Sequence, residues 1–265
     1  MIFISDVHDS PGALRRLVGL GSEIVILGDF VNLTDYRTGR GAVADVLGED
    51  FARRSAEARA RGDYAAMRAL WTEHAESSDL DLRTEIGKVL AGQYEQARAA
   101  LQGGEGLVIH GNVDRPEALL KALPAGFRYV HGETVSRDGM TLGFVGGGVS
   151  TPIQADGEVS DEEMTAILGR LGPVDVLCTH VPPAMPALRR DVVTGREERG
   201  SGPIRDYIDR HQPRYHLFGD VHQPQASTWR VRETRCMNAG YFRATGRFLR
   251  LSGGSVGVGS IPARS

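Results

Sequence analysis

The sequence predicts an α/β fold, because short apolar runs alternate with segments of helical periodicity along most of its 265 residues. Each run is rich in β-branched residues and is bounded by Gly, Asp or Asn, which is typical of a buried strand that ends in a polar loop. A hydrophobic share of 41% and a charged share of 25% fit a single globular domain over residues 1–265. The predicted strands are Ile2–Ile4, Ile24–Leu27, Leu107–Ile109, Thr141–Val145, Val174–Leu177 and Tyr215–Phe218.

Helical patterns fill many of the intervals between these strands. Pro11 suits the first turn of a helix, where its missing N–H would have no partner, and Ser160 followed by Glu163 has the spacing of a capping box. Residues 226–258 differ, because they have the pattern of consecutive strands with tight turns. That pattern predicts an antiparallel portion joined to the same core. The predicted helices are Pro11–Leu20, Arg115–Leu123, Ser160–Leu171 and Gly202–His211.

Residues 36–104 depart from this alternation, since they are rich in Ala, Arg and Glu and contain no clear strand. Leu70, Trp71, Ile86 and Leu90 fall at helical spacing, so we expect two or three amphipathic helices inserted between two core strands. The mixed charges are typical of a solvated face. The alternatives are a lid over the site or a surface for homo-oligomer formation, because an apolar stripe outside the core must cover something.

The net charge, the cysteine count and the lengths of the apolar stretches exclude several classes of protein. A net charge of −3 gives no global basic field, so neither a nucleic-acid polymer nor an anionic membrane is an expected partner. Two cysteines are too few for a disulfide framework. No secretory signal precedes the first predicted strand, and no apolar stretch approaches the roughly 20 residues that span a bilayer. We therefore expect a soluble protein in the cytoplasm.

Five separated segments carry side chains that bind metals, and each follows an apolar run. Polar loops at the carboxyl ends of strands are where α/β sheets gather their sites, so we expect the five to converge. Imidazole, carboxylate and amide oxygen together suit Mn, Fe or Zn better than Ca. Each segment alone has an ordinary interpretation as a turn or a structural His, and the joint occurrence indicates the metal site. The segments are Asp6-Val7-His8, Gly28-Asp29, Gly111-Asn112-Val113-Asp114, Cys178-Thr179-His180 and Gly219-Asp220-Val221-His222.

The order of these motifs resembles the calcineurin-like metallophosphoesterase superfamily over nearly the whole chain. The resemblance implies a two-sheet mixed β-sandwich flanked by helices, with two metal ions at the strand ends. It implies that one ion is held by Asp6, His8, Asp29 and His222, and the other by Asn112 and His180 with Asp29 as the bridge. Asp29, Asn112 and His180 are the ligands to which we also assign catalytic roles. The run from Gly146 to Pro152 resembles a loop near the site in small bacterial and archaeal members.

Two positions depart from the family pattern. Phosphomonoesterases of the family often carry a His after Gly-Asn, where this chain has Val113, which cannot move a proton. The last block usually begins Gly-His, where this chain has Asp220. We expect Asp220 to ligate the second ion through oxygen, which favours harder ions such as Mn or Mg. The alternative is that Asp220 stays outside the ligand set and the second ion binds weakly.

Both departures favour a diester substrate. A centre with less positive charge loses more attraction for a phosphomonoester dianion than for a diester monoanion. We therefore expect a phosphodiesterase for a small or nucleotide-like substrate, with two divalent ions, Mn first and Fe, Zn, Mg or Co as alternatives. A hydroxide between the two metals would attack phosphorus. The alternatives are a phosphomonoesterase or protein phosphatase on the same site, and a non-catalytic scaffold that kept the fold.

Other polar residues have plainer interpretations. Asp114 is expected to be a turn residue that bonds its own backbone, with a direct catalytic role as the alternative. Asn238 is expected to lie in a turn, although it follows a predicted strand and could approach the site. The arginines at positions 189, 190, 196 and 199 would either meet an anionic group of the substrate or belong to a solvated loop. Structural roles are expected for the remaining histidines, at positions 74, 110, 131, 211 and 216.

Overall fold

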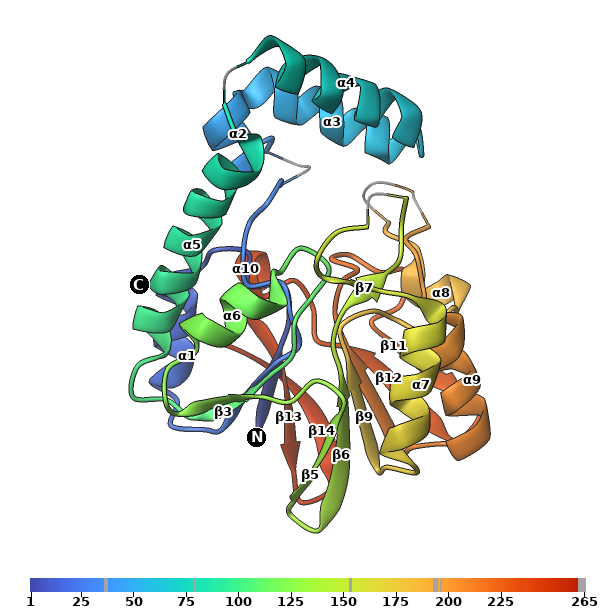
Figure 1. The fold of residues 1–265 in the computed structure, drawn as a ribbon. Coiled ribbons are helices and arrows are strands. Elements are labelled where there is room, and N and C mark those ends of the chain that lie inside the picture. The colour runs from blue at the N-terminus through green and yellow to red at the C-terminus, as the bar shows by residue number, and fades with distance from the viewer. Residues whose placement is uncertain (36–37, 79, 153, 193–194, 196, 262–265) are drawn as a thin grey trace.

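A computed structural model describes residues 1–35, 38–78, 80–152, 154–192, 195 and 197–261. Its core is a sandwich of two six-stranded mixed sheets, with helices on the outer face of each (Figure 1). This arrangement confirms the two-sheet α/β sandwich that the motif order implied.

The first sheet contains the amino-terminal half of the core. Its strand order is β14-β13-β1-β2-β3-β4, in which β1 to β4 run parallel and β13 and β14 are antiparallel additions at one edge. The strands are β1 (Ile2–Ile4), β2 (Ile24–Ile26), β3 (Gly106–Val108), β4 (Phe127–Tyr129), β13 (Arg247–Ser252) and β14 (Ser255–Ser260).

The second sheet has the order β11-β12-β10-β9-β6-β5, with four central parallel strands and an antiparallel strand at each edge. A separate parallel pair, β7 with β8, lies in the loops above it. The strands are β5 (Glu133–Arg137), β6 (Met140–Val145), β7 (Gly148–Val149), β8 (Glu158–Val159), β9 (Val176–Thr179), β10 (Tyr215–Phe218), β11 (Thr228–Val231) and β12 (Thr234–Asn238).

Helices cover the outer face of each sheet. On the first sheet lie α1 (Pro11–Val18), α6 (Pro116–Ala122) and half of α5 (Leu82–Leu101), and on the second lie α7 (Asp161–Leu171) and α9 (Gly202–His211). Pro11 is the first residue of α1, as predicted. The hydroxyl of Ser160 accepts a hydrogen bond from the backbone N–H of Glu163 at 3.1 Å, which confirms the predicted cap of α7. Two short helices, α8 (Pro186–Arg189) and α10 (Phe242–Thr245), lie in loops.

Strand β1 explains why the core strands are continuous apolar runs. Phe3 packs between the two sheets, whereas Ile2 and Ile4 pack under the helices on the outer face. Because successive side chains of a strand point to opposite faces, a strand buried on both faces needs apolar residues at every position. All three side chains are fully buried.

The carboxyl-terminal strands differ from the prediction. They do not form one antiparallel portion, because the hairpin of β11 and β12 extends the second sheet and the hairpin of β13 and β14 extends the first. In addition, β12 pairs in parallel with β10.

The sequence pattern did not predict β4, β5 or α10. In β5, two exposed residues lie on each side of Val135, its single buried residue, so the strand has no apolar run to detect.

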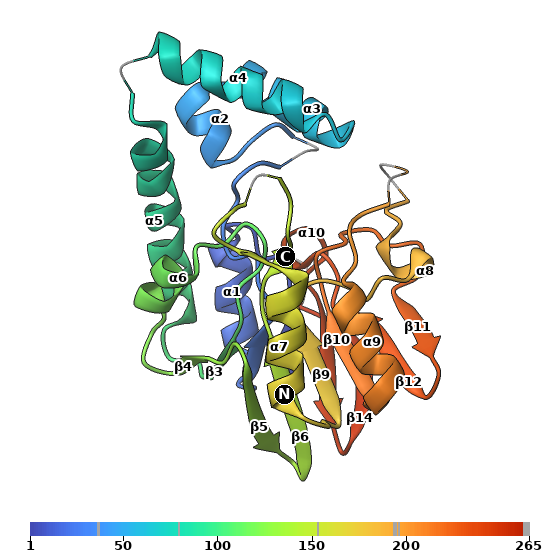
Figure 2. The ribbon, with the colours of Figure 1, turned by 45° about the vertical axis from the view of Figure 1, so that its right-hand side comes forward.

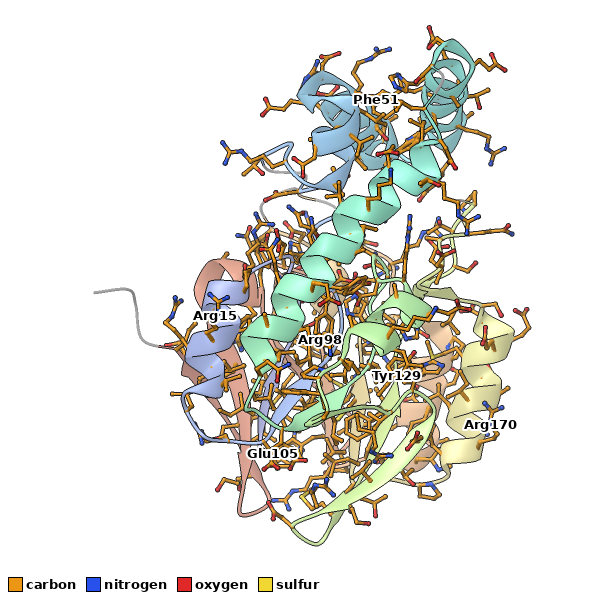
Figure 3. The ribbon with its side chains drawn as sticks, turned by 60° about the vertical axis from the view of Figure 1, so that its left-hand side comes forward. Arg15, Phe51, Arg98, Glu105, Tyr129 and Arg170 are labelled. Atoms are coloured by element: carbon orange, nitrogen blue, oxygen red, sulfur yellow. The ribbon has the colours of Figure 1, made fainter. Side chains whose placement is uncertain are left out.

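The described residues between positions 42 and 101 form four helices rather than the predicted two or three: α2 (Ala42–Leu47), α3 (Glu49–Ala60), α4 (Tyr64–Ser77) and α5. Helices α3 and α4 pack side by side through Phe51 and Trp71, whose rings meet edge to face at 5.1 Å. Figures 1 and 2 place this pair above the loops at one end of the sandwich, and Figure 3 shows α5 descending from it along the body. Among the described residues, no helix is long and apolar enough to cross a membrane.

Candidate metal centre

The predicted ligand segments all leave the carboxyl ends of strands at one end of the sandwich. They follow β1, β2 and β3 in the first sheet and β9 and β10 in the second. Several of the side chains sit on backbone with positive φ, which non-glycine residues adopt at a cost and which clusters at functional sites. These residues are Asp6 (φ 59°), His8 (φ 41°), Asp29 (φ 57°) and Asp220 (φ 66°).

Two glycines allow the loops after β2 and β3 to touch. A Cβ on Gly28 would lie 2.5 Å from the backbone nitrogen of Gly111, and a Cβ on Gly111 would lie 2.0 Å from Oδ1 of Asp29. Both distances are far below van der Waals contact, so only glycine fits at either position. The Gly-Asp and Gly-Asn motifs therefore have a common structural cause, which is the close approach that brings Asn112 beside Asp29.

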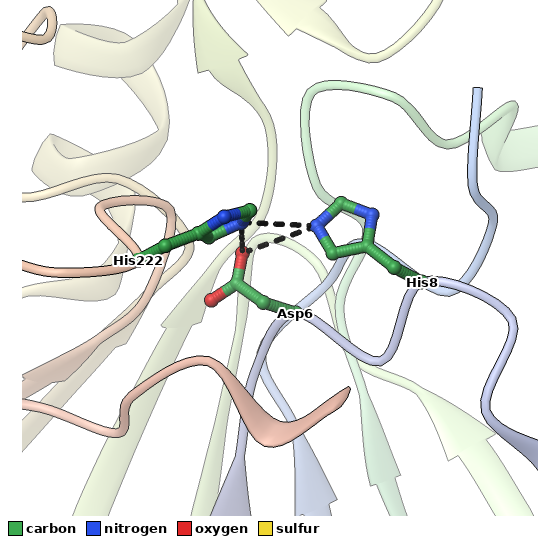
Figure 4. A group of neighbouring side chains, drawn as sticks. All are labelled: Asp6, His8 and His222. Carbon is green, nitrogen blue, oxygen red and sulfur yellow. Dashed lines mark hydrogen bonds and ion pairs between the residues drawn. The ribbon is translucent and has the colours of Figure 1, made fainter. Parts of the chain in front are cut away.

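The first group of donors consists of Asp6, His8 and His222, whose ligand atoms lie within 4.8 Å of one another (Figure 4). His8 Nε2 lies 3.1 Å from His222 Nε2 and 3.8 Å from Asp6 Oδ1, and His222 Nε2 lies 3.5 Å from the same Asp6 oxygen. Tyr241 stacks on the His222 ring with centroids 3.9 Å apart, which fixes the ring's orientation.

The second group surrounds His180, which is fully buried. Its Nε2 lies 3.4 Å from Asn112 Oδ1, 3.4 Å from Asp29 Oδ1 and 3.7 Å from Asp220 Oδ1. The other oxygen of Asp29, Oδ2, lies 3.5 Å from His8 Nε2 in the first group. Asp29 thus presents one carboxylate oxygen to each group. All seven residues predicted as ligands lie in this one cluster.

The hydrogen bonds around the cluster suit a pair of cations. Nδ1 of His8 donates to the Val31 carbonyl at 3.0 Å, and Nδ1 of His180 donates to the Leu27 carbonyl at 2.7 Å. Because Nδ1 carries the proton in both rings, each Nε2 points a lone pair into the cluster, as in metal-binding histidines. Asp6 Oδ2 accepts from the Asp220 backbone N–H, but buried Oδ1 has no hydrogen-bond partner. A cation would satisfy this oxygen and the facing lone pairs together.

Burial and neighbouring charges shift the pKa values of several groups in this cluster. Burial raises the pKa of Asp220 to about 7, and the charge of Asp29 adds to this effect. Burial together with the charges of Asp6 and Asp114 raises the pKa of Asp29 well above its usual value. Burial and the charge of His222 lower the pKa of His8 to about 4. Nearby divalent cations would reverse the first two shifts, since they favour ionised carboxylates.

Asp114 has a role that the sequence did not predict. Its Oδ2 accepts from the backbone N–H of Gly111, as a turn residue would, but also from that of Asp29, both at 2.8 Å. Its Oδ1 accepts from the Phe30 N–H at 3.0 Å and from the Tyr94 hydroxyl at 3.1 Å. The buried carboxylate of Asp114 therefore ties the Asp29 loop to the Asn112 loop, and Tyr94 ties both to α5.

We expect Asp114→Asn to destabilise the metal-free protein by about 2 kcal/mol, because the amide turns an NH₂ group towards backbone donors. Turnover should fall by about 10- to 100-fold, the usual effect of losing a partner of the metal ligands. Urea unfolding in EDTA and steady-state kinetics measure the two effects. Tyr94→Phe leaves the carboxylate but removes the hydroxyl that donates to Asp114 and accepts from the Arg115 N–H, and it should cost about 1 kcal/mol. Wild-type stability and turnover in Asp114→Asn would show that the hydrogen bonds of the Asp114 carboxylate are not needed to hold the Asp29 and Asn112 loops in place.

Other residues support the cluster from nearby strands. Asn238, expected in a turn, is buried at the end of β12, and its amide donates to the carbonyls of Gly219 and Val221 at 3.3 and 2.9 Å. It therefore anchors the loop that carries Asp220 and His222. The glycine run that begins at Gly146 lies at the cluster as well, since a Cβ on Gly148 would clash with Asn112. Of the arginines noted in the sequence, Arg196 lies outside the described residues.

The comparison with solved structures finds the same fold elsewhere. The crystal structure of TT1561 from Thermus thermophilus matches with 14% identity and a TM-score of 0.52, over 98% of this chain and 98% of that chain. Sulfate thiohydrolase SoxB from Thermus thermophilus, in complex with glycerol, matches with 13% identity and a TM-score of 0.42, over 95% of this chain and 42% of that chain. No protein-family model and no curated protein matches the chain.

Proposed function

We propose that this chain, which has a metallophosphoesterase-like fold, is a phosphodiesterase that uses two divalent metal ions to hydrolyse a small or nucleotide-like phosphodiester. The observation that carries the proposal is the position of Asp29, with one oxygen 3.5 Å from His8 Nε2 and the other 3.4 Å from His180 Nε2. A carboxylate placed in this way can join two ion sites. We infer that Asp6, His8 and His222 complete one site, and Asn112, His180 and Asp220 the other.

Two divalent cations, when bound, would supply Lewis acidity that activates water and offsets the negative charge that develops on the phosphoryl oxygens. The chain's own residues hold the arrangement in place. The Val113 N–H donates to Asp29 Oδ1 at 3.2 Å, and the Asp114 carboxylate fixes the Asp29 backbone. Together these contacts orient the carboxylate that belongs to both sites.

The charges of the cavity support a diester rather than a monoester. A cavity of about 130 Å³ lies over the cluster, and the charged residues that line it are one arginine, Arg59, and five acidic residues: Asp29, Asp35, Asp191, Glu198 and Asp220. Each carboxylate weakens the attraction for an anion, and the effect is twice as large for a dianion as for a monoanion. Val113 also lines this cavity and has no proton to give a poor leaving group.

A paired assay tests the proposal. The protein, supplied in turn with Mn, Mg, Fe, Co and Zn, is given bis(4-nitrophenyl) phosphate and 4-nitrophenyl phosphate under the same conditions. We expect the diester to have the higher kcat/KM, with Mn as the best metal. Monoester turnover far above diester turnover would instead identify a phosphomonoesterase. If neither ester is hydrolysed and the protein binds one ion or fewer per chain at saturating Mn, the chain is instead a non-catalytic scaffold that kept the fold.

A further inference from the structure

His216 is a polar residue in an otherwise apolar and aromatic strand. It belongs to β10, where Tyr215 and Leu217 pack between the two sheets and Phe218 packs under the helices on the outer face of the second sheet. Because side chains alternate along a strand, His216 lies on the outer face, and its ring stacks on that of Phe218 with centroids 4.9 Å apart. His216 is fully buried. A strand buried on both faces needs apolar residues, so this imidazole requires an explanation.

The imidazole belongs to a short chain of hydrogen bonds. Nε2 of His216 lies 2.8 Å from Oγ1 of Thr179, and the same Oγ1 donates to the carbonyl of Val181 at 2.7 Å. A carbonyl can only accept, so the single hydroxyl proton of Thr179 points to Val181. Thr179 must then accept from His216, which places the imidazole proton on Nε2. Burial lowers the pKa of His216 to about 3, so the ring is neutral near pH 7.

The proton on Nε2 leaves Nδ1 of His216 as a buried acceptor. Among the described residues, this nitrogen has no hydrogen-bond partner. A buried polar atom without a partner lowers the stability of the fold, and an apolar ring of similar shape would avoid that loss. The stability of the fold therefore does not explain the imidazole, and the hydrogen bond to Thr179 is what it provides.

The bond between Thr179 and Val181 spans the proposed metal ligand His180. The two residues flank His180 in the chain, so their bond fixes the backbone from which its side chain projects. The His180 carbonyl also accepts from the Gly219 N–H at 2.8 Å, and its Nδ1 donates to the carbonyl that follows β2. His216 acts on the first of these restraints, because its N–H occupies the acceptor side of the Thr179 hydroxyl and leaves the proton facing Val181.

We propose that His216 and Thr179 are positioning residues for His180, which aim its Nε2 at the second group of donors and so determine how tightly an ion binds there. Both act through His180, and neither is a ligand itself. The inference rests on the proposed function for the assignment of His180 as a ligand. It gives His216, for which the sequence predicted a structural role, a part in metal binding.

Replacing His216 by Phe tests the proposal. The variant keeps a ring that can stack on Phe218, removes the nitrogen without a partner and deletes the donor to Thr179. In EDTA, it should melt at the wild-type temperature or above it. In a calorimetric titration with Mn, the dissociation constant of one ion should rise about tenfold, and that of the other should change by less than about threefold. Wild-type affinity for both ions, or an equal loss at both, would overturn the proposal.

Two further variants separate positioning from packing. His216→Gln places an amide N–H close to the position of Nε2, so it should restore the wild-type affinity for both ions. His211→Phe makes the same replacement at a partly buried histidine of α9, whose ring lies 4.6 Å from that of Tyr207, and it should leave both affinities unchanged. A weakened ion in His211→Phe, or no recovery in His216→Gln, would show that the effect is one of packing and would contradict the hydrogen-bond chain.

NMR of the metal-free protein separates this inference from the proposed function. Long-range proton–nitrogen correlation spectra report which nitrogen of each imidazole carries the proton, with no ion or substrate present. We expect the proton of His216 on Nε2 and that of His180 on Nδ1, with the His180 signal shifted or broadened in His216→Phe. A proton on Nδ1 of His216, or an unchanged His180 signal in the variant, would overturn the inference whether or not a diester is cleaved. The expected spectra and Mn affinities without cleavage of any ester would sink the proposed function and keep the inference.

Discussion

Replacing Asp29 by Asn is expected to lower turnover by at least about 10³-fold, more than the 10- to 100-fold typical of residues that only support ligands. Asp29 presents one oxygen to each donor group, at 3.5 Å from His8 and 3.4 Å from His180. An amide of the same size keeps the packing, but it replaces one anionic oxygen with an NH₂ group that cannot bind a cation. Elemental analysis after dialysis against Mn should show fewer than two ions per chain.

The stability of this variant distinguishes lost chemistry from lost folding. In EDTA, Asp29→Asn should unfold at the same temperature as the wild type or at a higher one. Burial and the charges of Asp6 and Asp114 already disfavour the ionised form of Asp29, so a neutral group relieves repulsion. Asp209→Asn, a surface ion-pair variant, should behave as the wild type in both assays. Two ions per chain and near-normal turnover in Asp29→Asn would rule out the bridging role.

Removing the metals is expected to abolish turnover and to lower thermal stability. Without cations, buried Asp6 Oδ1 has no hydrogen-bond partner, and the carboxylates of Asp6, Asp29 and Asp220 face one another. An ion present at 100 times its dissociation constant stabilises the fold by about 2.7 kcal/mol. For a domain of this size, that corresponds to a rise in melting temperature of about 5–10 °C per ion.

Differential scanning fluorimetry in EDTA, followed by titration with Mn, measures this shift, and a diester assay on the same samples follows recovery of activity. Asp6→Ala is the useful comparison, because it removes a proposed ligand together with the buried oxygen that has no hydrogen-bond partner. Its melting temperature should respond less to Mn than that of the wild type. A wild-type melting temperature that is the same with and without Mn, with full activity in EDTA, would contradict a metal centre.

The ligand-bearing loops could be predicted from the sequence because their strands are buried on both faces. Such strands are continuous apolar runs, so β1, β2, β9 and β10 and the polar residues after them were detectable. The glycine before Asp29 and the one before Asn112 were also visible as motifs, although the reason for them, a backbone contact between two loops, appears only in the structure.

The parts that could not be predicted depend on contacts between distant segments. The hairpins β11–β12 and β13–β14 have similar local patterns, but they join different sheets, which strand propensity does not encode. Asp114 has the sequence of a turn residue, and its bonds to Asp29 and Tyr94 span 85 and 20 residues. The position of Arg59 over the site depends on how α3 and α4 lie on α5, which composition alone leaves open.

A crystal structure of the Mn-loaded protein, with an anomalous difference map recorded near the Mn absorption edge, tests the central claim most directly. The account predicts two peaks, one contacted by Asp6, His8 and His222 and the other by Asn112, His180 and Asp220, with Asp29 in contact with both. A map without peaks in this cluster, or with a single peak that Asp29 does not touch, would contradict it.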